Sequence, residues 1–134
     1  MIKPVSRCLL LLPALALPAL AHAAMPSSAV SNQVSVAGIH ADMALDATEL
    51  EAVHLHLHHV INCLEGPAGK DFDAKAANPC HGMGAGAIVD AKDEPAVESN
   101  LLLALKQAEQ GAHATTLERA HADAQQVFKL LQRH

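Results

Sequence analysis

The chain has 134 residues, a formal net charge of −5 at neutral pH, and aromatic side chains at only 1% of its positions. This length fits a single domain. An acidic chain without Trp or Tyr lacks the basic patch and the stacking surfaces that nucleic-acid binding requires. We therefore expect one small domain without a nucleic-acid partner.

The N-terminus is organised like a secretory signal peptide. Lys3 and Arg7 precede an apolar run at 8–20, which is followed by Ala21-His22-Ala23. The run is too short to cross a membrane, which takes about 20 apolar residues. We predict that residues 1–23 are removed on export, so that the mature protein is periplasmic or secreted and has no membrane anchor.

Residues 24–45 are small and polar with scattered Val, and they show no strong period. We interpret them as a lead-in segment that is helical at most near Ala37–Leu45. The domain proper is then expected at 46–134. No internal repeat of convincing period is evident along the chain.

The first clear helix is predicted after this lead-in, with Asp46 or Thr48 as its N-cap. Apolar side chains recur at three- and four-residue intervals from Leu50 to Leu64, which is the pattern of an amphipathic helix. Gly66-Pro67 is expected to end it.

Two further helices are predicted in the second half of the chain. One runs from about Pro95 to Gln110, with Gly111 as its stop, and the other covers about 115–132, with Thr115 or Thr116 as its cap. The short connection between them favours antiparallel neighbours. The expected fold is therefore all-α, a small antiparallel bundle of three to four helices.

A long irregular segment at 65–92 separates the first predicted helix from the other two. Removal of the signal peptide leaves two cysteines, Cys63 and Cys80. An even pair in an exported chain predicts a disulfide, which here would pin the segment to the end of the first helix. Two metal-bound thiolates are the competing interpretation, which an oxidising compartment disfavours.

The same segment contains Asn62-Cys63-Leu64, Gly66-Pro67, Asn78-Pro79-Cys80 and then Gly82. This pattern resembles that of small exported bacterial helical proteins of unassigned function. The resemblance implies a fixed, cystine-pinned loop and carries no activity to this chain.

Histidine is the strongest functional signal, because four of the six residues at 54–59 are histidine. On a helix, His54 and His58 lie one turn apart on one shoulder of the apolar stripe. His121 holds a similar edge position on the last predicted helix. These three side chains form one candidate ligand set for Cu²⁺, Zn²⁺ or Ni²⁺, with Glu51 or Glu118 as an oxygen ligand or as the group that orients an imidazole.

The opposite shoulder of the same helix offers a second candidate set. It carries His56 and His59, and the predicted disulfide would bring His81 close to them. The other histidines of the mature chain are interpreted as structural or solvated: His40, His113 and His134.

The sequence thus favours a periplasmic helical protein that binds a transition-metal ion through histidines and has no catalytic role, since no catalytic motif is present. One alternative is a structural or interaction protein, with a protein partner or a second copy of itself, whose histidines are solvated. Another is a haem binder, which would hold haem non-covalently because the chain has no C-x-x-C-H motif.

Overall fold

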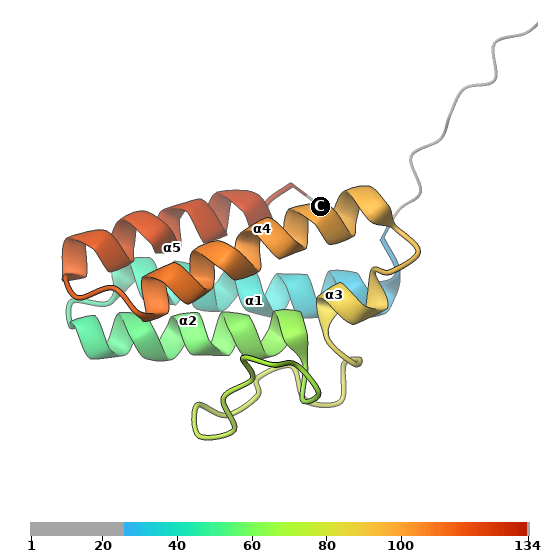
Figure 1. Cartoon of the computed structure of the whole chain (residues 1–134), viewed down its shortest axis with the longest axis horizontal. Helices are drawn as coiled ribbons and strands as arrows, with labels where there is room; N and C mark the ends of the chain where they lie inside the picture. The colour runs from blue at the N-terminus through green and yellow to red at the C-terminus, as the bar shows by residue number, and fades with distance from the viewer. Residues whose placement is uncertain (1–25, 134) are drawn as a thin grey trace, which may run out of the picture.

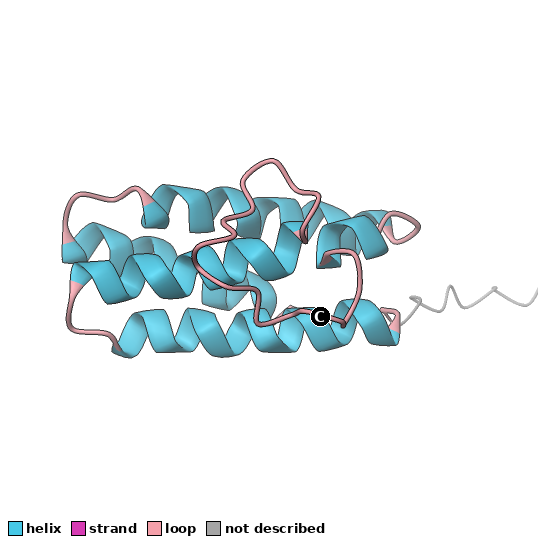
Figure 2. Ribbon diagram, turned by 90° about the horizontal axis from the view of Figure 1, so that it is seen from below, coloured by secondary structure: helices cyan, strands magenta, loops and turns pink. Residues whose placement is uncertain are grey.

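The computed structural model describes residues 26–133, so the predicted signal peptide at 1–23 lies outside the described residues. The helices are α1 (Ser28–Asp46), α2 (Leu50–Glu65), α3 (Ala87–Asp90), α4 (Pro95–Ala112) and α5 (Leu117–Leu131), and no strand occurs in this range (Figure 2). Helices α1 and α4 run in one direction and α2 and α5 in the other (Figure 1). Each long helix packs against two neighbours, in the order α1, α2, α4, α5 and back to α1. The all-α antiparallel bundle is confirmed.

The prediction of a loose lead-in at 24–45 is wrong, because α1 is one of the four long helices of the bundle. Its buried apolar side chains are small and follow a regular helical spacing: Val30, Val34, Ala37, Ala41 and Ala44. Alanine gives little hydrophobic contrast in a sequence, although it lets neighbouring helices approach closely. The hydroxyl of Ser27 caps the helix by accepting a hydrogen bond from the Val30 backbone N–H (3.3 Å).

The two helical hairpins, α1–α2 and α4–α5, are related by an internal repeat that the sequence analysis missed. The residues that cap α1 and α4, Ser27 and Glu94, are separated by 67 positions. At the same offset, Thr48-x-Leu50-Glu51-x-x-His54 recurs as Thr115-x-Leu117-Glu118-x-x-His121. Identical apolar residues follow the same offset: Val30 with the partly buried Val97, and the buried pairs Ala37 and Ala104, Ala41 and Ala108, Val60 and Val127, Leu64 and Leu131. The repeat escapes notice because a long loop separates its copies and alanines fill much of its core.

Reciprocal hydrogen bonds join the two hairpins at one end of the bundle. His54 Nε2 on α2 lies 2.9 Å from the Ala114 carbonyl oxygen, in the connection between α4 and α5. His121 Nε2 on α5 lies 2.9 Å from the Ala47 carbonyl oxygen, in the connection between α1 and α2. The two bonds are equivalent under the internal repeat, so the hairpins pack with approximate two-fold symmetry.

The ends of α2 and α5 agree in part with the predictions. Helix α2 begins at Leu50, later than predicted, because the preceding residues form the connection from α1. It ends at Gly66, as predicted, where φ is +73°. Thr116 caps α5 by accepting a hydrogen bond from the Arg119 backbone N–H (3.2 Å), which confirms one of the two predicted caps.

Gly111 does not stop α4, as the sequence had suggested, because that helix continues to Ala112. Its role is to allow close packing. A Cβ at Gly111 would lie 2.6 Å from Leu57 Cδ1 on α2 and 3.0 Å from Asp123 Cβ on α5. Glycine therefore lets the three helices pack closely where they meet.

The long connection between α2 and α4 folds along the outside of the bundle (Figure 1) and is held at several points. The predicted disulfide between Cys63 and Cys80 is confirmed. The fully buried Asn62 side chain donates to the Asp73 carbonyl (2.8 Å) and accepts from the Asp73 backbone N–H (2.8 Å). On α1, the buried Gln33 side chain binds both the Gly86 backbone N–H and the Asp90 carboxylate of this connection. The connection is thus fixed against both α1 and α2.

Within the described range, none of the helices is both long enough and apolar enough to cross a membrane.

Candidate metal centre

Three histidines meet at the seam between α1 and α2. His56 and His59 are one helical turn apart on α2, and His40 faces them from α1. His40 Nδ1 lies 3.3 Å from His56 Nδ1 and 3.2 Å from His59 Nδ1. The connection at 47–49 is short, so it folds α1 back antiparallel to α2 and brings position 40 level with positions 56 and 59. We call these three residues the His40 cluster.

The spacing of the nitrogen atoms in the His40 cluster suits a transition-metal ion. Zinc–nitrogen bonds of about 2.0–2.1 Å in a tetrahedral site place neighbouring nitrogens about 3.3 Å apart. The two short Nδ1–Nδ1 distances, 3.3 and 3.2 Å, match that value. Of the residues that the structure describes, only one other trio of ligand-type side chains is comparably close, namely Glu65, Asp71 and Glu109.

The surroundings of the His40 cluster favour the neutral form of His40 and His56. Partial burial, together with the nearby His59 and His56, lowers the pKa of His40 from 6.5 to about 4. Partial burial and the neighbouring His59 also lower the pKa of His56. Neutral imidazoles retain the lone pair that a metal ion needs, so protons compete weakly for these two residues at neutral pH.

The structure brings together two of the three residues of the second candidate set. His56 and His59 meet as expected, but their third partner is His40 and not His81. His81 follows Cys80 in a turn, where its side chain is exposed. The disulfide does pin the loop near α2, but this turn carries the His81 side chain into solvent. His40 was interpreted as structural or solvated because it is a lone histidine in a segment that was interpreted as a loose lead-in.

The first candidate set is not gathered at one point. The ring nitrogens of His54 and His121 each bind a loop carbonyl of the opposite hairpin, as described above. His58 instead lies near the long connection, with its Nδ1 3.9 Å from an Asp73 carboxylate oxygen. The three residues form no close trio within the described part of the chain.

The two glutamates proposed to assist that set, Glu51 and Glu118, are exposed in the first turns of α2 and α5. In these positions a negative side chain interacts favourably with the helix dipole. Their matching places follow from the internal repeat.

A cleft of about 630 Å³ lies on the other shoulder of α2, where the long connection approaches α4. Its walls include His58, Asp71, Glu109 and His113. Burial, and then the neighbouring Asp71 carboxyl group, raises the pKa of Glu109. The adjoining carboxylates make this side of α2 acidic.

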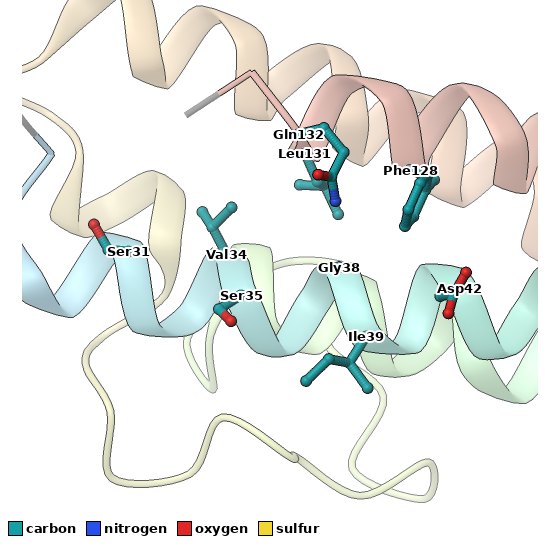
Figure 3. Close-up of a pocket in the computed structure, with 9 residues that line it drawn as sticks. All are labelled: Ser31, Val34, Ser35, Gly38, Ile39, Asp42, Phe128, Leu131 and Gln132. Carbon is teal, nitrogen blue, oxygen red and sulfur yellow. The ribbon is translucent and has the colours of Figure 1, made fainter.

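A groove of about 350 Å³ separates α1 from α5. Figure 3 shows Phe128 and Leu131 of α5 pointing toward Val34 and the bare backbone of Gly38, whereas Ile39 points away (Figure 3). The residues that line the groove include no histidine and no cysteine, and Asp42 supplies their single carboxylate. The groove therefore lacks the set of ligands that a metal site needs.

Comparison with known proteins identifies no relative: no protein-family model matches the chain, and no curated protein or solved structure is significantly similar to it. We therefore infer the function from the geometry of the His40 cluster.

Proposed function

We propose that this protein binds one transition-metal ion through the Nδ1 atoms of His40, His56 and His59. The observation that supports this proposal is the pair of Nδ1–Nδ1 distances, 3.3 and 3.2 Å, which match the edge of a tetrahedral coordination sphere. Imidazole nitrogen is a good ligand for zinc, copper and nickel, so the candidate ions are these three. The short Nδ1–Nδ1 contacts also fit a hydrogen-bonded cluster without metal, which is the alternative that an experiment must exclude.

An ion fits this cluster better than haem does. Haem iron takes one or two axial ligands, on opposite faces of the ring, whereas the three nitrogens here converge on one point. The proposed role is binding and release of the ion, since three protein ligands leave a coordination position open to solvent or to another molecule.

We further propose that the protein works outside the cytoplasm after cleavage behind Ala23. The supporting observation is the Cys63–Cys80 disulfide, a bond that persists mainly in oxidising compartments. Histidine ligands suit such a compartment, because cysteine thiolates there are readily oxidised.

The proposal is tested by calorimetric titration of the tag-free mature protein with Zn²⁺, Cu²⁺ and Ni²⁺ at pH 7. Replacing His40, His56 or His59 singly with alanine should weaken binding of the preferred ion by at least about tenfold. His81→Ala is the matched control, because it removes an exposed histidine of the same chain and should leave the affinity unchanged.

The result that would overturn the proposal is equal affinity for every ion in the wild-type protein and in all three cluster variants. In that case the short nitrogen contacts would be hydrogen bonds between neutral imidazoles.

A further inference from the structure

The fourth coordination position of the His40 cluster has a candidate ligand on α1. Met43 lies one helical turn beyond His40, and its side chain is 46% exposed although it is large and apolar. It is not among the side chains of the buried core. An exposed methionine that packs into no core is free to take another conformation.

Helix geometry directs Met43 toward the cluster. Residues three apart on a helix are surface neighbours, with Cβ atoms about 5–6 Å apart. Helical side chains lean toward the N-terminus of their own helix, so Met43 leans over the turn that carries His40. The two helices are antiparallel, so His56 leans along α2 in the opposite direction, toward the level of Met43. The general directions of helical side chains therefore allow Met43 and His56 to approach one another at the seam.

We propose that the Met43 thioether is the fourth ligand, so that the site binds the cuprous ion, Cu⁺, in preference to Zn²⁺. This inference rests on the metal site proposed above. Soft thioether sulfur favours Cu⁺, whereas Zn²⁺ is bound by nitrogen, thiolate and carboxylate ligands. A thioether carries no proton and no charge, so the site gains a ligand without any competition from protons.

The test compares Met43→Leu with Met83→Leu. Leucine keeps the apolar bulk and removes the sulfur, and Met83 is the matched control because it lies in the long connection, partly buried against the core. Cu⁺ affinity is measured under anaerobic conditions by competition with a chromogenic Cu⁺ chelator, and Zn²⁺ affinity is measured by competition with a zinc indicator. X-ray absorption spectroscopy of the Cu⁺-loaded protein reports whether sulfur is bound.

We expect Met43→Leu to weaken Cu⁺ binding on the order of tenfold, to change Zn²⁺ binding by less than about twofold, and to remove the copper–sulfur signal. Met83→Leu should change none of these quantities.

Unchanged Cu⁺ affinity in Met43→Leu, or a copper–sulfur signal that persists in it, would overturn the inference. Loss of sulfur in Met83→Leu alone would also overturn it. The histidine variants separate this failure from failure of the metal site itself: if His56→Ala still abolishes binding, the three-histidine site stands without Met43.

Discussion

Replacing His54 or His121 with alanine should lower the stability of the fold and leave metal binding intact. Each ring donates a hydrogen bond to a loop carbonyl of the opposite hairpin, so each variant leaves that carbonyl without its partner. Replacing His56 with alanine should instead weaken metal binding and leave the stability of the fold intact. The comparison distinguishes histidines that hold the hairpins together from histidines that bind an ion.

The magnitudes follow from the burial of the two carbonyl groups. Ala114, the partner of His54, is only 8% exposed, so His54→Ala should cost about 2 kcal/mol from the lost bond and the buried unpaired oxygen. Ala47, the partner of His121, is half-buried, so water can replace the ring and the cost should be about 1 kcal/mol. The bonds have separate partners, so the double variant should lose about 3 kcal/mol.

Urea denaturation of the metal-free protein measures these losses. With an m-value of about 2 kcal/mol/M, His54→Ala should lower the midpoint by about 1 M. The exposed His81→Ala serves as the control, with no change expected. A His54→Ala protein of wild-type stability that no longer binds metal would refute this reasoning and would restore His54 as a ligand.

Three further predictions concern the rest of the molecule. Replacing both Cys63 and Cys80 with alanine should lower the free energy of unfolding by about 3 kcal/mol, because the bond closes a loop with a sequence separation of 17; equal urea midpoints for the variant and the oxidised wild type would contradict this. Gly38→Ala should raise stability by about 0.5–1 kcal/mol, since its Cβ would meet nothing within 4 Å, whereas Gly111→Ala should lower it by about 1–3 kcal/mol through overpacking; thermal melts that shift in the same direction would be inconsistent with the packing described. Burial lowers the pKa of His40 from 6.5 to about 4 in the folded protein, so protonation of His40 favours the unfolded chain, and the metal-free protein should lose stability as the pH falls from 6.5 toward 4. His40→Gln should show a smaller loss between pH 7 and pH 5 in urea titrations, and an identical loss would show that this imidazole does not resist protonation.

The sequence by itself determined the elements with strong side-chain contrast. The spacing of Leu and Val along α2 and the stop at Gly66 were sufficient to predict that helix. The even cysteine pair predicted the disulfide. In each case the information is local, or it depends only on a count of residues.

Helix α1 and the internal repeat were missed for a physical reason. The side chains that α1 buries are mainly alanine and valine, and alanine differs little from its polar neighbours in hydrophobicity. Its burial depends on how closely the other helices approach. The repeat was likewise hidden, because its two copies share mainly core positions, many of them alanine, and a long loop separates them.

The ligand set was decided by tertiary structure alone. Periodicity placed His56 and His59 on one shoulder of α2 and His54 and His58 on the other, and it favoured neither pair as metal ligands. Only the packing of α1 against α2 brings His40 to the first shoulder, and only the packing of the two hairpins engages His54 with a loop carbonyl. A sequence specifies the angle of a side chain around its own helix, but the partner that meets it there depends on which helix packs against that face.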